Sequence, residues 1–318
     1  MGKRKIFKIV FAILSIFLCV AFYELFGICI AYKKQPEVSN TIKKETQNDS
    51  WNECSENMER AVIIEKNPEA LLQRVRLIRN AKEDIILSTF AFQSDESGKL
   101  ILGALHDAAD RGVHIRLLVD GMESWIDMEG NPYFYGLSSH ENVEIKLYNK
   151  ANPLKPWKMM GRMHDKYLIA DGKRYILGGR NTHNYFLGDF PGHKNYDRDV
   201  LVVCDEPEKE NSVNQLLEYF ETIWEQEDSG YFHDNKKLAN RKSVKNAVLE
   251  LQNGYQKYFE ENKERLCDTD YTDETFETEK IALVSNTIHT GSKEPVVWYQ
   301  LGELMKNAKK PVKIHTPY

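Results

Sequence analysis

The sequence predicts an α/β fold in which helices flank a mixed β-sheet, preceded by an N-terminal transmembrane helix. Two observations lead to this prediction. From about residue 58 onward, apolar runs of strand length alternate with amphipathic helical segments, which is typical of layered α/β domains. Before that point, the chain carries one apolar run that is long enough to cross a membrane.

The apolar run covers residues 9–32 and contains a single charge, Glu24. As a helix it would be about 36 Å long, and a hydrocarbon core is about 30 Å thick. Residues 1–8 form a basic end that should stay in the cytoplasm, so we expect a single-pass anchor in the cell membrane with an extracytoplasmic soluble domain. Lys33 and Lys34 reduce the difference in positive charge between the two ends of the run, which weakens the prediction of orientation. A cleaved signal peptide is the competing interpretation.

Composition narrows the function classes. The chain has 42% hydrophobic and 29% charged residues, which is a globular composition, and its formal net charge of -5 provides no basic field for nucleic acid. The five cysteines form no CxxC pair or Cys/His spacing. We therefore expect neither a metal nor a cofactor, and no nucleic-acid partner.

The elements of the expected domain follow one another in order. Residues 33–57 are polar and predict a stalk, and residues 58–233 predict the domain itself. The pattern predicts helices over 68–80, 99–110 and 211–224, and strands over 61–64, 84–92, 113–121, 143–148 and 199–203. A helix between two strands implies a parallel crossover. Residues 163–179 predict a hairpin that turns at Asp171 and Gly172.

The C-terminal third divides into two further regions. Residues 234–294 are highly charged but carry apolar residues at helical spacing, which predicts a helical connector. The sequence NAKKPVKIHT at 307–316 resembles NAKEDIILST at 80–89. We therefore expect residues 295–318 to begin a second, truncated copy of the domain.

The segment RMHDKYLIAD carries the chemistry. His164 and Lys166 lie two residues apart, so on a strand they share one face and can meet the same phosphate. A neutral imidazole can attack phosphorus, and an ammonium can stabilise the equatorial oxygens without a metal. Downstream, Gly178 and Gly179 permit close backbone approach, and Asn181 can donate to a phosphate oxygen.

HxKxxxxD followed by GGxN resembles the signature of the phospholipase D superfamily, and residues 64–224 are similar to the first half of bacterial cardiolipin synthases. The resemblance implies a phospholipase D-like layered domain. It also implies that His164 is the phosphohistidine nucleophile or its acid/base counterpart, that Lys166 and Asn181 bind phosphate, and that Asp171 is a supporting acid. An Asp-Gly turn would explain Asp171 without chemistry.

Members of this family combine two such motifs, with one histidine attacking and the other protonating the leaving group. This chain contains one motif. The second half would come from a missing C-terminal part or from a homodimer partner, or else the chain is a degenerate, inactive half.

The resulting hypothesis is phosphatidyl transfer from a phosphatidylglycerol-type phospholipid to an alcohol, or hydrolysis when water is the acceptor. A nuclease or other phosphodiesterase acting as a dimer, and a catalytically silent membrane-tethered half, are the alternatives. Lys155, Trp157 and Lys158 are candidates for lipid contact, although an ordinary lid would carry the same residues.

Overall fold

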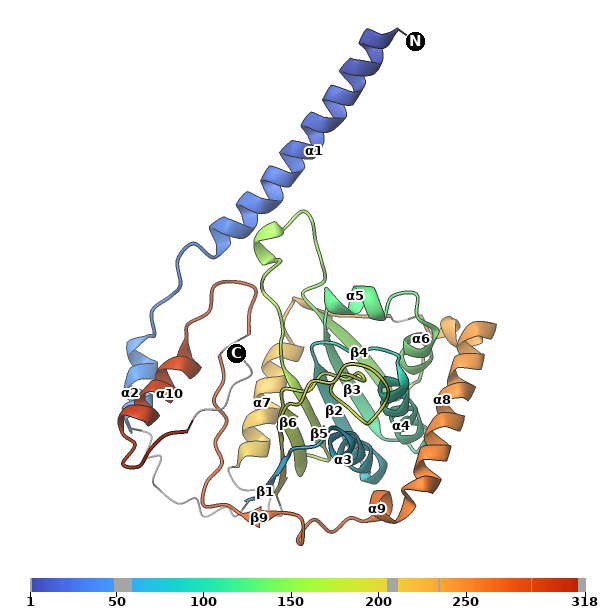
Figure 1. Ribbon diagram of the computed structural model, residues 1–318, viewed down its shortest axis with the longest axis vertical. Helices are drawn as coiled ribbons and strands as arrows, with labels where there is room; N and C mark the ends of the chain where they lie inside the picture. The colour runs from blue at the N-terminus through green and yellow to red at the C-terminus, as the bar shows by residue number, and fades with distance from the viewer. Residues whose placement is uncertain (1, 49–58, 205–210, 234, 287, 314–318) are drawn as a thin grey trace. The chain divides into compact units, whose positions relative to one another are not determined.

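The computed structural model describes residues 2–48, 59–204, 211–233, 235–286 and 288–313. The chain forms two compact units (Figure 1). The first, called the anchor unit below, comprises Met1–Asn52, Ala151–Arg162 and Val284–Tyr318. The second, called the sheet unit, comprises Glu53–Lys150 and Met163–Leu283.

The sheet unit is built on a mixed sheet with nine strands among the described residues, in the order β8-β4-β3-β2-β5-β6-β7-β1-β9. Strands β2, β3 and β4 are parallel, as the helical crossovers require, and the other neighbours are antiparallel. The strands are β1 (Glu59–Ile64), β2 (Asp84–Thr89), β3 (His114–Asp120), β4 (Val143–Tyr148), β5 (Lys166–Ala170), β6 (Arg174–Gly178), β7 (Asp199–Cys204), β8 (Ser229–Tyr231) and β9 (Phe276–Glu277).

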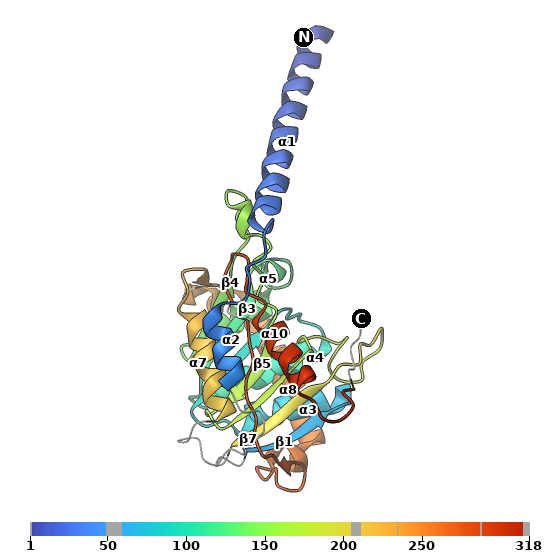
Figure 2. The same cartoon turned by 90° about the vertical axis from the view of Figure 1, so that its left-hand side faces the viewer.

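Helices cover both faces of the sheet, which confirms the predicted α/β class (Figures 1 and 2). On one face α4 packs against α3 and α8, and its Gly103 leaves no room for a Cβ because the Leu251 carbonyl of α8 lies against it. On the other face lies α7, whose Tyr219 ring contacts Tyr167 of β5. The helices of this unit are α3 (Asn67–Asn80), α4 (Glu96–Asp110), α5 (Glu123–Asp127), α6 (Pro132–Ser138), α7 (Ser212–Trp224), η2 (Lys236–Asn240), α8 (Lys242–Glu261) and α9 (Lys263–Cys267).

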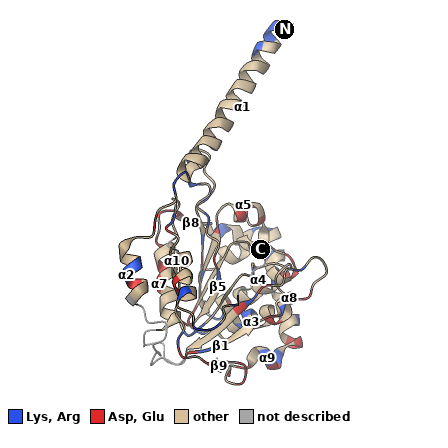
Figure 3. Ribbon diagram, turned by 60° about the vertical axis from the view of Figure 1, so that its left-hand side comes forward, with Lys and Arg blue, Asp and Glu red and all other residues tan. Residues whose placement is uncertain are grey.

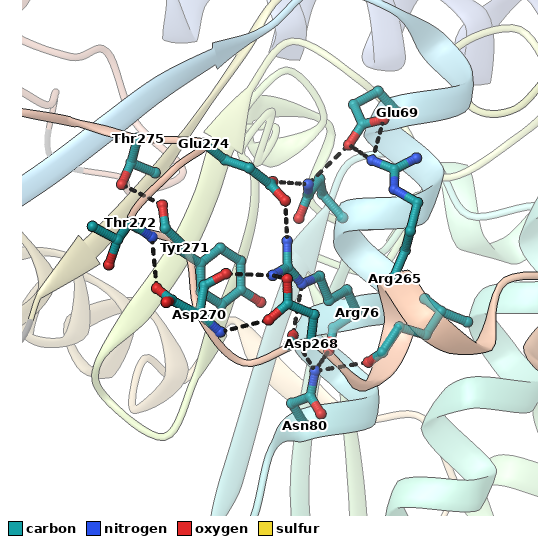
Figure 4. A network of polar contacts seen from close by, with 12 residues as sticks. Glu69, Arg76, Asn80, Arg265, Asp268, Asp270, Tyr271, Thr272, Glu274 and Thr275 are labelled. Carbon is teal, nitrogen blue, oxygen red and sulfur yellow. Dashed lines mark hydrogen bonds and ion pairs between the residues drawn. The ribbon is translucent and has the colours of Figure 1, made fainter.

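Much of the charged segment expected to act as a connector lies against the sheet unit. The acidic loop after α9 is fastened to α3 by Arg76, which is 1% exposed (Figure 4). Its guanidinium forms ion pairs with Asp268 at 3.0 Å and Glu274 at 2.9 Å, and donates to the Asp270 carbonyl. Acidic composition therefore serves here to neutralise a buried cation.

The anchor unit contains α1 (Lys3–Ala31), α2 (Asn40–Asn48), η1 (Pro156–Lys158) and α10 (Val296–Lys306). Among the described residues, α1 is the one helix long and apolar enough to cross a membrane, and Figure 3 shows charge at its N-terminal end. Helix α2 occupies part of the expected stalk, whose residues 49–57 lie outside the described residues. In the region expected to begin a second domain, α10 ends one residue before Asn307, whereas the matching Asn80 is the last residue of α3; residues 314–318 are not described.

Candidate active site

The structure brings His164 and Lys166 together at the start of β5, a central strand. Lys166 is the first residue of β5 and pairs with Thr89 of β2, while His164 lies two residues before the strand and is exposed. The Lys166 ammonium donates to the His164 carbonyl at 2.7 Å. The Phe90 ring lies 4.5 Å from the imidazole, centroid to centroid, and 5.2 Å from the ammonium. An exposed imidazole and a buried cation thus share one aromatic support.

Burial determines the electrostatics of Lys166, which is 7% exposed. Loss of hydration lowers the pKa of its ammonium to about 8, while the nearby carboxylates of Asp165, Asp197 and Asp120 favour the charged form. Below that pH the ammonium is charged and poorly solvated. Such a cation is suited to stabilising negative charge on a phosphoryl group.

Two carboxylates missed by the sequence analysis hold the segment around His164. Asp120, at the end of β3, is fully buried and accepts from the Met163 N–H at 3.0 Å and from the Met122 N–H at 3.1 Å. Asp165 accepts from the Tyr219 hydroxyl of α7 at 2.8 Å, and burial together with this carboxylate raises the pKa of that hydroxyl. Asp120 was hidden in an Asp-Gly pair at a strand end, which is normally interpreted as a turn.

The two glycines of residues 178–181, called the GGRN segment below, are required by close packing. A Cβ at Gly178 would collide with the carboxylate of Asp199, and one at Gly179 with that of Asp197. The Asn181 Oδ1 then accepts from the Ala91 N–H at 3.3 Å, one residue beyond Phe90. The segment therefore lies against the end of β2, near the residues that support His164.

A buried ionic triad fixes the same segment to the fold. Asp199, which is 2% exposed, pairs with Arg74 at 2.9 Å and with Arg180 at 3.2 Å. Arg180 also donates to the carbonyls of Ile64 and Glu65. Burial lowers the pKa of the Arg180 guanidinium, and Asp199 opposes this shift. These partners are far apart in sequence, so no local pattern could reveal them.

Asp171 lies at the other end of β5, and the structure does not bring it to His164. It has a φ of 52° and begins the turn into β6. Its carboxylate accepts from the backbone N–H groups of Glu83 at 2.8 Å, Lys82 at 3.0 Å and Asp84 at 3.2 Å. These contacts fasten the turn to the start of β2.

The three candidate lipid contacts, Lys155, Trp157 and Lys158, belong to the anchor unit, where η1 lies beside α1.

The described residues contain no group of three or more His, Cys, Asp or Glu side chains able to hold a metal ion.

The fold and the arrangement around His164 define a phospholipase D-like domain. Residues 74–224 match the family described as "Cardiolipin synthase, PLD-like domain". Residues 74–224 are therefore a phospholipase D-like domain, similar to that of the cardiolipin synthases.

Relatives of this chain include an uncharacterized protein of Helicobacter pylori strain J99, 31% identical over 60% of this chain and 38% of its own length. Cardiolipin synthase C of Escherichia coli is 29% identical over 49% of this chain and 34% of its own length. The chain thus spans little more than a third of these curated relatives. Among solved structures, phosphatidylserine synthase of Haemophilus influenzae superposes with a TM-score of 0.45 at 17% identity, over 70% of this chain and 48% of that one.

Proposed function

We propose that this protein transfers phosphatidyl groups, or cleaves phosphodiesters, of phospholipids through a phosphohistidine formed on His164. The observation that carries the proposal is the exposed imidazole beside the buried Lys166 ammonium, both in contact with Phe90. The similarity to cardiolipin synthases supports a phospholipid as substrate. A phosphatidylglycerol-type donor and an alcohol or water acceptor are the reactants of this proposal.

In the first step, a nitrogen of the neutral His164 imidazole attacks phosphorus and the bond from phosphorus to the head-group oxygen breaks. The leaving oxygen takes a proton from a general acid. In the second step, that group removes a proton from the acceptor hydroxyl, which attacks phosphorus and releases His164. Lys166 stabilises the phosphoryl oxygens in both steps, and Asn181 donates its amide to one of them.

The general acid in this proposal is the histidine of a second phospholipase D-like domain, which comes from a further part of a longer chain or from a homodimer partner. Mixing tests the homodimer. When inactive His164→Asn chains are added to active chains, activity falls with the square of the active fraction if each site needs two intact histidines. A linear fall excludes a homodimer partner as the source of the second histidine.

We place the sheet unit outside the cytoplasm, on the basis of the basic residues that precede the apolar part of α1. Cys267 is an exposed free thiol in this unit. A membrane-impermeant maleimide should label it in intact cells, and Cys267→Ser is the matched control. Labelling only after the cells are opened would reverse the orientation.

A trapping experiment tests the covalent step. The full chain in vesicles is incubated with phosphatidylglycerol carrying a labelled phosphate, quenched without acid and digested. We expect label on His164, none in His164→Asn, and normal labelling in the control His114→Asn, because His114 pairs with Glu144 at the far end of β3. Equal label in the wild type and His164→Asn would exclude this nucleophile. Labelling by single-stranded DNA alone would keep the nucleophile and exclude the lipid substrate.

A further inference from the structure

Residues 151–162, called the α1-contact loop below, pack against the last turns of the apolar helix α1 (Figures 1 and 2). The Tyr23 hydroxyl donates to the Leu154 carbonyl at 2.9 Å. Gly27 is buried against Pro156, and a Cβ there would lie 2.5 Å from the proline Cγ. The helix therefore has a glycine where the loop approaches it most closely.

A third segment of the anchor unit holds this arrangement in place. The backbone of Thr290 lies against Gly161, so a Cβ on this glycine would collide with it. The Tyr32 hydroxyl donates to the Thr290 carbonyl at 3.2 Å, and the Ser292 hydroxyl donates to the Ala31 carbonyl at 2.8 Å. The end of α1, the α1-contact loop and residues 290–292 therefore form one packed cluster.

The contacts on α1 fix the depth of the loop in a bilayer. α1 ends at Ala31. Gly27 lies about 6 Å and Tyr23 about 12 Å before this end along the helix axis, at about 1.5 Å per residue. The headgroup layer on each side of a bilayer is about 5 to 8 Å thick. If the apolar part of α1 fills the hydrocarbon core, the loop lies at the boundary between headgroups and acyl chains.

The side chains of the α1-contact loop fit that boundary. Leu154 is 76% exposed, Met160 57% and Trp157 42%, so three apolar side chains project away from the protein. Lys155 is exposed among them. Apolar side chains interleaved with cations, and tryptophan in particular, are typical of the interface of an anionic membrane.

We propose that the α1-contact loop is a lipid-binding element that inserts at the surface of an anionic bilayer beside the exit of α1. The proposal rests on α1 spanning the membrane, and it deepens the proposed function by assigning the place where lipid reaches the protein. The loop ends at Arg162, two residues before His164. At most about 7 Å of backbone therefore separates the loop from the histidine that would attack the lipid phosphate.

Quenching by brominated lipid tests the insertion without any need for activity. The full chain is placed in phosphatidylglycerol and phosphatidylcholine vesicles containing lipid brominated near the carboxyl end of the acyl chain. We expect Trp157→Phe to lower the fraction of tryptophan emission that the brominated lipid quenches. Trp298→Phe is the matched control, because Trp298 of α10 is also exposed, at 74%. This control should leave the quenched fraction unchanged. Unchanged quenching in Trp157→Phe would overturn the proposal.

A kinetic comparison separates this proposal from the proposed function. Lys155→Gln should raise the KM for phosphatidylglycerol in vesicles by about fivefold, the effect expected for one cation near an anionic surface. Leu154→Asn should act in the same direction. Turnover of a soluble short-chain phosphodiester should be unchanged in both variants. An equal loss of turnover on both substrates argues against a membrane role of the loop. If the wild type shows no turnover but Trp157 is still quenched, the enzymatic proposal is rejected and the lipid-binding role of the loop is retained.

Discussion

At one end of β5, the buried Lys166 lies beside the exposed His164. At the other end, Asp171 begins a turn, and its carboxylate accepts hydrogen bonds from three backbone N–H groups. The two ends belong to one short motif, yet the first carries the groups that we propose act on a substrate and the second satisfies backbone groups of the protein. A motif in sequence is therefore not necessarily a cluster in space. Substitutions at the two ends should separate loss of activity from loss of stability.

The largest effect is expected from His164→Asn, because it removes the proposed nucleophile. Turnover should fall by at least about 10⁴-fold, in line with the loss of a catalytic nucleophile in other enzymes. The midpoint of urea unfolding should not change, since the imidazole is exposed. Comparable destabilisation and inactivation would give His164 a structural role and remove the contrast between the ends.

The next effect concerns the charge of Lys166. Because burial lowers the pKa of its ammonium to about 8, the cation is present below that pH and lost above it. Turnover should therefore decline as the pH rises through about 8, approaching tenfold per unit. Lys166→Arg keeps its charge and should abolish this decline, whatever its effect on the rate at neutral pH. A decline that persists in Lys166→Arg would assign the titration to another group.

A smaller effect, on stability, is expected at the other end of the strand. Asp171→Asn keeps a side chain that tolerates a φ of 52° but removes the charge that strengthens three hydrogen bonds. The free energy of unfolding should fall by about 1 to 3 kcal/mol. Turnover per folded molecule should change less than about threefold, because distant positions are coupled by only about 0.5 kcal/mol or less. A loss of turnover as large as that of His164→Asn would place Asp171 in the chemistry.

The smallest effect should come from Gly172→Ala in the same turn. Gly172 has a φ of 56°, and a Cβ there would meet only a Leu217 methyl at 3.6 Å. Backbone strain alone should lower the free energy of unfolding by about 1 kcal/mol. Turnover should stay at the wild-type value; a clear loss would indicate that the turn communicates with the far end of β5.

Local patterns predicted much of this architecture. Periodicity placed β4 at its observed bounds, and the Asp-Gly pair predicted the turn between β5 and β6. The expected strand over residues 84–92 was too long, because β2 ends at Thr89 and Phe90 then supports His164. Apolar character alone could not distinguish a residue of the sheet from one that supports the site.

The missing parts of the candidate site depend on contacts between distant segments. Asp120 and Tyr219 hold the residues around His164 from β3 and α7, and neither stands in a pattern that suggests this role. Trp157 was a candidate for lipid contact, but only the structure places its loop against Gly27 of α1. Long-range packing fixes such positions, and periodicity carries no record of it.

The triad of Arg74, Asp199 and Arg180 ties the GGRN segment to α3 and β7, and this link affects how the protein should fail on heating. Opening the GGRN segment would take Arg180 away from Asp199 and from the carbonyls of Ile64 and Glu65 and leave these acceptors without that donor, so a partly opened segment is a poorly populated state. The segment should therefore separate from the sheet only when the whole sheet unit melts. Activity and tertiary structure would then disappear at one temperature, and the folded molecule would keep the proposed phosphate site assembled up to that point.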